Sequence, residues 1–400
     1  PTTFRRRSRH SLSPPRVSIV SQPGLRSDGM SHLDVARADP IADEIVHVTQ
    51  LEPLARQNLI GPVWDYVSGG AGDESTLADN VEAWARIKLA PHTLVDVSTL
   101  DTSISLLGQQ LAHPILLAPT ARHTAYHPDG ESATIRGARK ADALYVQSSL
   151  GGTSLREVGE VARSVDEPWW FQLYIQHDRE WTSQLVAHAF EQGASGLAVT
   201  VDTPTLGARD RDKRNNLGAA TGAQYPILDG SPVRPDPTPA HRRIYNPHLS
   251  PNITWADLEW LVEISPVPVI PKGILRPDDA RRAVDTGASA VMVSNHGARN
   301  LDTVPATVDA LAGVVAAVGR DVPVIVDGGI RRGTDIAKAL CLGASAVMVG
   351  RPYIWGLATY GERGVTHVIE MLRTEFEMAM ALLGAPAIAD LTTDLLWPPT

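Results

Sequence analysis

Residues 287–297 read GASAVMVSNHG, a glycine-led junction that enters an apolar strand and ends in polar residues. Residues 343–352, GASAVMVGRP, repeat this pattern, and residues 193–196, GASG, begin a third copy. A glycine that ends a helix and precedes a β-branched run is typical of the helix-to-strand junction of a βα unit. The repeat therefore predicts parallel strands that are joined by helices.

Eight apolar runs of this kind follow one another along the chain. They are HPILLAPTA (113–121), ALYVQSS (143–149), PWWFQLY (168–174), GLAVTVDT (196–203), VPVIPKG (267–273), AVMVSNHG (290–297), VPVIVDGG (322–329) and AVMVGRP (346–352). Between them lie stretches with apolar residues at three- and four-residue steps, which indicate helices packed on a sheet. Eight strands favour a closed (β/α)₈, or TIM, barrel over a doubly wound sheet. We expect the barrel at about residues 113–384, with a helical segment before it and a long loop, Thr205 to about Asn252, after the fourth strand.

The composition limits the class of partner. The 400 residues are 43% hydrophobic and 20% charged, which suits one large α/β domain, and the formal net charge is -9. Nucleic acids and anionic membranes attract clustered positive charge, so we expect neither as a partner and expect a small molecule instead. No apolar run reaches the roughly 20 residues of a membrane span, and Cys341 is the single cysteine. These features predict a soluble, cytoplasmic protein without a metal site.

Residues 1–29 differ from the rest of the chain. They are rich in Arg, Ser and Pro and contain no acidic residue before Asp28, a composition that does not build a core. Our interpretation is a disordered or spuriously translated leader, and the alternative is an organelle transit peptide. We therefore assign residues 30–400 to the folded domain.

The ends of the predicted strands nominate the functional site. In a (β/α)₈ barrel the active site lies where the carboxyl ends of the strands meet. A barrel that served only as a scaffold would not need many hydrogen-bonding groups on that rim. The strand ends supply Pro119, Thr120, Ala121, Ser148, Ser149, Gln172, Tyr174, Thr200, Asp202, Lys272, His296, Arg299, Asp327, Gly328, Gly329, Gly350 and Arg351.

The last two loops, DGGIRRG (327–333) and GRP (350–352), predict a phosphate site. The loops after strands seven and eight of such barrels commonly bind phosphate through backbone N–H groups and a helix N-terminus. Arg331 and Arg351 would add positive charge. The alternative is that Gly328 and Gly329 only form a tight turn.

The nucleotide that best suits the rim is FMN. No GxGxxG motif follows an early strand, so a dinucleotide on a Rossmann unit is not indicated. Ser148, Gln172 and Thr200 could meet the polar edges of an isoalloxazine ring. Lys272 could place positive charge near its N1–C2=O edge, and its alternative role is a salt bridge at a strand end.

His296 is the candidate general base. It follows the sixth strand, and Asp202 ends the fourth, so the carboxylate could orient the imidazole and stabilise its protonated form. A histidine alone at a strand end would more often be structural. Arg209 and Arg299, which the phosphate does not need, suggest a carboxylate substrate because a guanidinium matches a carboxylate bidentately.

These residues together resemble the FMN-dependent α-hydroxy acid oxidase and dehydrogenase family, which includes glycolate oxidase, lactate oxidases and mandelate dehydrogenase. SNHGARNLD (294–302) is similar to its active-site signature, and VDGGIRRGTD (326–335) and VGRPYIWGLA (349–358) are similar to its FMN-phosphate segments. WDYVSGGAGDESTLADN (64–80) resembles its N-terminal helical segment. The similarity extends from about residue 46 to about residue 392.

The resemblance implies the oxidation of an L-2-hydroxy acid to a 2-oxo acid, with two electrons passing to FMN as a hydride or through a carbanion. It implies a base assisted by an aspartate, two arginines on the substrate carboxylate, two tyrosines that hydrogen-bond the substrate, and a lysine beside the flavin. In that order these residues are His296, Asp202, Arg209, Arg299, Tyr66, Tyr174 and Lys272. The residues implied to hold FMN are Pro119, Thr120, Ala121, Ser148, Gln172, Thr200, Lys272, Ser294, Asp327, Gly329, Arg331, Gly350 and Arg351.

Some features leave alternatives open. Leu150 stands where glycolate-oxidising relatives tend to carry an aromatic residue, and His123, Tyr126 and His127 could face the barrel mouth or solvent. The resemblance implies a homo-oligomer, a tetramer or an octamer, and favours reoxidation by dioxygen over another acceptor. Rival hypotheses are a larger or peptide-derived 2-hydroxy acid, a dehydrogenase or monooxygenase reaction, and a nucleotide-binding barrel without turnover.

Overall fold

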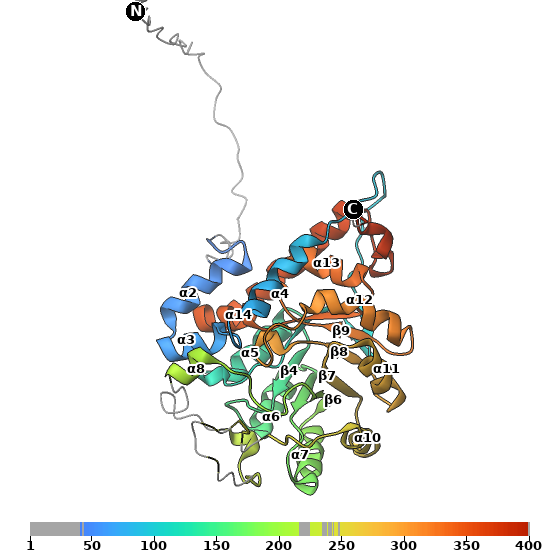
Figure 1. Cartoon of the computed structure of the whole chain (residues 1–400). Helices are drawn as coiled ribbons and strands as arrows, with labels where there is room; N and C mark the ends of the chain where they lie inside the picture. Colours follow the sequence, from blue (N-terminus) through green and yellow to red (C-terminus); the bar gives the residue numbers. More distant parts are fainter. Residues whose placement is uncertain are drawn as a thin grey trace, which may run out of the picture. The chain divides into compact units, whose positions relative to one another are not determined.

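Eight parallel strands close into a barrel in the order β10-β3-β4-β5-β6-β7-β8-β9 (Figure 1). Each of the eight predicted apolar runs overlaps one of them, so the predicted (β/α)₈ barrel is confirmed. The strands are β3 (Ile115–Leu117), β4 (Tyr145–Ser148), β5 (Trp169–Leu173), β6 (Ala194–Thr200), β7 (Val269–Ile274), β8 (Val291–Val293), β9 (Val324–Val326) and β10 (Ala346–Val349).

The computed structural model describes residue 41, residues 44–215, 225–233 and 249–398, and isolated positions between 238 and 246. The prediction for residues 1–29 lies outside the described residues. The described residues all fall within the unit of residues 40–400.

Helices alternate with the strands and surround the barrel (Figure 1). The helix-to-strand junctions have the predicted glycine geometry, because Gly193, Gly287 and Gly343 have φ of 103°, 97° and 96°. Such left-handed values favour glycine, which explains why one short motif recurs at three junctions. The surrounding helices are α5 (Gly130–Lys140), α6 (Leu155–Ser164), α7 (Arg179–Glu191), α10 (Trp255–Ile264), α11 (Pro277–Asp285), α12 (Thr307–Val318), α13 (Gly333–Cys341) and α14 (Arg351–Leu383).

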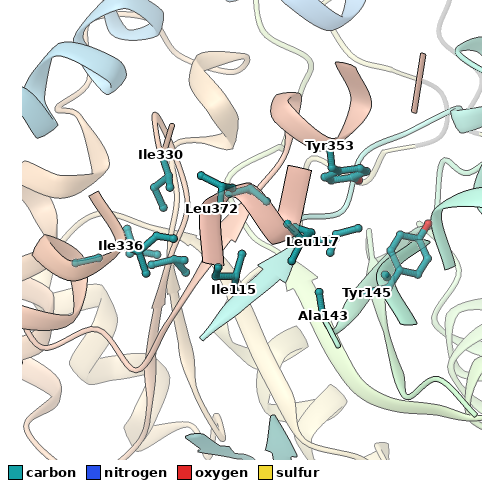
Figure 2. Close-up of a cluster of buried hydrophobic side chains, with 14 of the residues drawn as sticks. Ile115, Leu117, Ala143, Tyr145, Ile330, Ile336, Tyr353 and Leu372 are labelled. Atoms are coloured by element: carbon teal, nitrogen blue, oxygen red, sulfur yellow. The ribbon is translucent and has the colours of Figure 1, made fainter. Parts of the chain in front are cut away.

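Alternation along each strand divides the core into two layers. In β3, Leu116 points into the barrel, while Ile115 and Leu117 face the helices, and all three are fully buried. Figure 2 shows part of the outer layer, a cluster of buried side chains that includes Ile115, Leu117, Ile336 and Leu372. Burying one such side chain stabilises the fold by about 1.5–3 kcal/mol. The barrel interior is therefore a packed core beneath the rim.

A short hairpin belongs to the inner layer. Strands β1 (Ile104–Leu106) and β2 (Gln109–Leu111) pair antiparallel, and their Leu106 and Leu111 are buried with the inward-facing barrel residues. Gln109 Nε2 donates to Ser195 Oγ, 2.5 Å away, at the amino end of β6. The hairpin therefore lies at the amino ends of the strands, which leaves the carboxyl ends as the open face.

The predicted N-terminal helical segment reaches the carboxyl-end loops. It comprises α2 (Leu51–Asn58), α3 (Gly61–Ser68) and α4 (Ser75–Arg86). Trp84 Nε1 donates to the carbonyl of Gly328, 2.9 Å away, in the loop after β9. A Cβ atom on Gly329 would lie 1.6 Å from the carbonyl oxygen of Asn80, so this glycine allows α4 to approach the loop.

The predicted long loop follows β6. Its described part contains the short helix α8 (Asp210–Asn215), which packs near α3, and the turn Pro226–Leu228. Sequence reasoning predicted a loop here and missed α8. Residues 216–224 and 234–237 of the predicted loop, and several positions between 239 and 248, lie outside the described residues.

The described residues contain neither a helix that could span a membrane nor a candidate metal site. No described helix combines the length and the apolar character that crossing a bilayer requires. No described group of three or more His, Cys, Asp or Glu side chains could hold a metal ion. Cys341 is a buried, free cysteine.

Candidate active site

A cavity of about 1100 Å³, counted with its open mouth, lies at the carboxyl ends of the strands. Its walls come from α3, from the loop after β6 and from strand ends all round the barrel. The predicted residues that line it are Tyr66, Pro119, Thr120, Ala121, Ser148, Gln172, Tyr174, Thr200, Arg209, Lys272, His296, Arg299, Asp327, Gly329, Arg331, Gly350 and Arg351. Gly328 lines it as well, whereas Ser149 does not, and Asp202 and Ser294 support the wall residues His296 and Lys272 from behind.

One side of the cavity floor is a chain of side-chain hydrogen bonds across three strands. Ser148 Oγ donates to Gln172 Oε1, 3.2 Å away, and Gln172 Nε2 donates to Thr200 Oγ1, 2.9 Å away. The strand register places Ser148 beside Gln172, so these contacts follow from the pairing of β4 with β5. All three side chains are buried, and their orientation is therefore fixed before any ligand binds.

The other side of the floor carries charge. Lys272 Nζ donates to Ser294 Oγ at 3.0 Å, and Ser294 Oγ donates to Asp327 Oδ2 at 2.8 Å. The Lys272 ammonium also lies 3.5 Å from Asp327 Oδ2. The salt bridge proposed as the alternative role of Lys272 therefore exists, yet both residues also line the cavity. Asp327 Oδ1 is buried without a hydrogen-bond partner among the described residues.

The loops after β9 and β10 have the features of an anion site. Gly328 and Gly329 have φ of 97° and 76°, and a Cβ on Gly350 would meet no described atom closer than 3.7 Å. A side chain at Gly350 would therefore enter the cavity. The N-terminus of α14, a 33-residue helix, follows directly.

Two partly buried arginines flank these loops without a carboxylate ion pair in the described part of the chain. Arg331 lies over the ring of Trp355, 5.0 Å from its centroid, and Arg351 donates to the carbonyls of Val67, Gly69 and Gly297. Burial lowers the pKa of Arg331 to about 10. Burial and the neighbouring positive charges lower that of Arg351 to about 9. A nearby anion would reverse both shifts.

These observations fit FMN. The phosphate would meet two uncompensated guanidinium groups, a glycine loop and a helix N-terminus, all on one side of the cavity. The isoalloxazine ring would meet the hydrogen-bonded floor, where Asp327 Oδ1 lacks a partner and Lys272 supplies a positive charge. The residues predicted to hold FMN line this cavity, except Ser294, which contacts Lys272 and Asp327, and their role in binding FMN stays a prediction.

His296 lies in a left-handed turn. His296, Gly297 and Ala298 have φ of 58°, 60° and 61°, a conformation that costs a non-glycine residue roughly 1–2 kcal/mol. Asn295 Oδ1 accepts a hydrogen bond from Ala298 N at 3.2 Å and one from Asn80 Nδ2 at 2.9 Å. Strain of this kind persists only where surrounding contacts determine it, and it aims the imidazole into the cavity.

His296 and Asp202 form the predicted pair. His296 Nδ1 lies 3.0 Å from Asp202 Oδ1, and Thr203 Oγ1 donates to the same oxygen at 2.8 Å. Burial opposes ionisation of Asp202, but His296 and Lys272 outweigh it and its pKa is lowered. Burial lowers the pKa of His296 against the influence of Asp202, so the neutral imidazole is favoured. With Nδ1–H donating to Asp202, Nε2 is the unprotonated nitrogen and can accept a proton.

The substrate end of the cavity contains two arginines and two tyrosines. Arg209 Nε donates to the carbonyl of Arg299 at 3.0 Å, and Arg299 lies over the ring of Tyr66, 4.7 Å from its centroid. Tyr174 Oη lies 3.3 Å from His296 Nε2, and burial raises the pKa of the phenol, so it stays protonated. A carboxylate bound by the arginines would therefore lie next to the imidazole.

Sequence reasoning missed several supporting residues. Asn300 Nδ2 donates to the carbonyl of Asp202 at 2.9 Å and to Thr203 Oγ1 at 2.8 Å. Gly273 has φ of 114°, and a Cβ there would lie 2.4 Å from the Cβ of Asp202. Thr203 and Asn300 are adjacent in sequence to predicted site residues, a signal that could have found them. For Gly273 the only signal was its place after Lys272.

His123 faces neither the mouth nor solvent, so both alternatives for this residue were wrong. It is fully buried, with Nε2 2.7 Å from Thr120 Oγ1 and Nδ1 2.9 Å from Thr134 Oγ1. Thr120 lines the cavity, and His123 therefore supports the wall from behind. Tyr126 does line the cavity.

Residues 55–398 match the family model described as FMN-dependent dehydrogenase. The chain belongs to the FMN-dependent dehydrogenase family. Among curated relatives, an L-lactate oxidase of Nostoc sp. is 46% identical over 356 residues, which are 88% of this chain and 98% of that protein. A peroxisomal (S)-2-hydroxy-acid oxidase of Oryza sativa subsp. japonica is 45% identical over 87% of this chain and 94% of its own.

Solved structures of this family have the same fold. A crystal structure of mandelate oxidase with (S)-2-phenylpropionate superposes with a TM-score of 0.80 at 37% identity and covers 88% of this chain and 98% of its own. A mutant of flavocytochrome b2 with pyruvate bound gives a TM-score of 0.80 at 36% identity, over 89% of this chain and 87% of its own. Membership confirms the predicted family, the FMN cofactor and the class of enzyme, an FMN-dependent oxidoreductase.

Replacing Arg331 tests the phosphate site. Arg331→Met removes a buried guanidinium that has no carboxylate partner, so we expect FMN affinity to fall about 10- to 100-fold, the range for one charge-assisted hydrogen bond. Titration of the apoprotein with FMN, followed by flavin fluorescence, measures the change. The matched control is Arg332→Met, because Arg332 pairs with Glu375 at 2.6 Å on the surface. Equal affinities in the two variants would contradict the assignment.

Proposed function

We propose that the protein oxidises an L-2-hydroxy acid to the corresponding 2-oxo acid, with FMN as the first electron acceptor. The observation that carries this proposal is the joint placement of the His296–Asp202 pair and the Arg209–Arg299 pair on one cavity. Relatives named for lactate, for (S)-2-hydroxy acids and for mandelate support the substrate class, and their variety leaves the individual acid open.

Binding would begin at the arginine pair. Arg299 Nη2 is buried without a hydrogen-bond partner among the described residues, and Arg209 lies beside it. Burial and the Arg299 charge lower the pKa of Arg209 to about 10, which a bound carboxylate would reverse. Two guanidinium groups can bind a carboxylate bidentately and fix the orientation of the neighbouring carbon.

His296 would then accept a proton from the substrate. Oxidation of the alcohol removes two electrons and two protons, and His296 Nε2 is the base for one of these protons. Asp202, 3.0 Å from Nδ1, keeps the imidazole in the required tautomer and stabilises the imidazolium that forms. Tyr174 Oη, 3.3 Å from Nε2, would hold the substrate oxygen close to the base.

The remaining steps involve the cavity floor beside His296, where β7 carries Lys272 next to β8. Bound FMN supplies the acceptor for the two electrons that leave the substrate. Lys272 would keep a positive charge beside it, balanced by Asp327 at 3.5 Å when the site is at rest. The hydrogen-bonded floor of Ser148, Gln172 and Thr200 would hold the ring at a constant orientation to His296.

Dioxygen is the proposed second acceptor, and the product would be hydrogen peroxide. Support comes from relatives that are named oxidases. A homo-oligomeric assembly and a cytoplasmic location stay predictions. One relative is named as peroxisomal, which keeps an organelle among the candidate locations.

Anaerobic mixing tests the proposed reaction. The holoenzyme is mixed with L-lactate, glycolate and (S)-mandelate in the absence of oxygen, and we expect at least one acid to bleach the flavin absorption. Admission of air should restore the absorption and release one hydrogen peroxide for each acid oxidised. Bleaching by none of the three would contradict a small 2-hydroxy acid substrate, and recovery without peroxide would contradict the oxidase reaction.

The pH dependence tests the role of His296. Because burial lowers the pKa of its imidazole below the usual 6.5, the base form predominates at neutral pH. We expect kcat/KM to rise with pH through that lowered pKa and to stay constant above it, since kcat/KM reports groups of the free enzyme. Steady-state assays across the pH range measure this profile. A value of kcat/KM that keeps rising well above neutrality would contradict the assignment.

A further inference from the structure

Asp212 on α8 lies between the two arginines of the substrate end. Its Oδ2 is 3.9 Å from Arg209 Nη1 and 3.9 Å from Arg299 Nη2. Both distances exceed that of a hydrogen bond, and the Nη2 group of Arg299 has no other partner among the described residues. The Asp212 carboxylate is thus close enough to offset the positive charge of the two arginines. It does not form a hydrogen bond with Arg299 Nη2, which can still donate to a ligand.

The arginines do not need Asp212 to hold their positions. Arg299 Nη1 donates to the carbonyls of Tyr66 and Gly69, at 2.5 and 2.9 Å, and Arg209 Nε donates to the carbonyl of Arg299 at 3.0 Å. These backbone hydrogen bonds use Arg299 Nη1 and Arg209 Nε, which are not the nitrogen atoms that lie 3.9 Å from Asp212. The contribution of Asp212 is therefore electrostatic.

The electrostatic effect of Asp212 acts in an environment that is partly shielded from solvent. The side chains of Asp212, Arg209 and Arg299 are 22%, 11% and 15% exposed. At this degree of burial, the Asp212 carboxylate would repel a ligand carboxylate that binds to the arginine pair. This repulsion would weaken the binding of the ligand by roughly tenfold. The product of the proposed reaction keeps the carboxylate of the substrate, so the same repulsion would act on both.

We infer that Asp212 is a resident counter-charge that weakens carboxylate binding at the arginine pair and speeds the release of the 2-oxo acid. This inference rests on the proposed function, because it assumes that the arginines bind the carboxylate of a 2-hydroxy acid. Asp212 does not touch the reacting atoms. It acts through Arg209 and Arg299, and it sets how long a carboxylate stays on them.

The variant Asp212→Asn tests the inference, because it keeps the shape of the side chain and removes its charge. Calorimetric titration of the holoenzyme with oxalate, which has no C–H bond to oxidise, measures binding without turnover. We expect the Kd of oxalate to fall by roughly tenfold in Asp212→Asn, together with a lower KM for the substrate. The matched control is Asp210→Asn, since Asp210 is an exposed carboxylate of the same helix without a described ion pair.

The pH dependence of the Kd of oxalate distinguishes an electrostatic role of Asp212 from a purely structural one. Burial raises the pKa of Asp212, which Arg299, Arg209 and Arg122 only partly offset, and Asp65 acts in the same direction as burial. Protonation would remove the repulsion, so the difference in Kd between wild type and Asp212→Asn should narrow as the pH falls.

Each outcome of the titration has one meaning. A higher Kd in Asp212→Asn would overturn the inference and make Asp212 a residue that positions the arginines. An unchanged Kd would also overturn it. Oxalate binding to neither protein, with no bleaching by any 2-hydroxy acid, would reject the proposed function and the inference together, whereas bleaching with an unchanged Kd would reject the inference alone.

Discussion

The site depends on a pair of amides. Asn80 and Asn295 exchange two side-chain hydrogen bonds, of 2.9 and 2.8 Å, and both are buried. Asn295 in turn accepts from Ala298 N and so stabilises the left-handed turn that contains His296. Because Asn80 lies on α4, the N-terminal segment and not the barrel alone determines where the base points. An unsatisfied amide at this depth would cost about 1–3 kcal/mol, which explains why the strained turn persists.

The cavity floor has a hydrogen-bonded part and a charged part. Hydrogen bonds join Ser148, Gln172 and Thr200 on one part of the floor, and Lys272 joins Asp327 through Ser294 on another. Apart from Asp327 Oδ1, these side-chain groups already have hydrogen-bond partners within the protein, so little reorganisation is needed around the cofactor. Arg209, Arg331 and Arg351 differ, because burial lowers the pKa of each guanidinium and a bound anion would raise it again. Anion binding is therefore the property that both ends share.

The sequence was sufficient for the barrel and for most of the cavity wall. Strand ends are readable because apolar runs stop at polar residues, and in a parallel barrel all of these ends meet on one rim. His296 and Asp202 could be paired because the strands that carry them are separated by one strand. The roles assigned to these residues stay predictions until variants are measured.

Other features depend on contacts that periodicity does not encode. Asn80 contacts Asn295 across 215 positions, and nothing in either local pattern indicates the other. His123 was misplaced because a histidine near a loop resembles a surface residue until its partners Thr120 and Thr134 are known. Asp212 lies on α8, which sequence reasoning missed because the composition of the surrounding segment is typical of a loop. The contacts of these residues can be identified only from interatomic distances in the structure.

The central claim is that His296 and Asp202 act as one unit on the substrate. The most direct test is a double-mutant cycle on the rate of flavin reduction, with His296→Gln, Asp202→Asn and the combined variant, each checked for bound FMN. We predict that His296→Gln retains FMN and slows reduction by at least about 100-fold, and that adding Asp202→Asn slows it little further. Additive losses, or normal reduction in His296→Gln, would contradict the account.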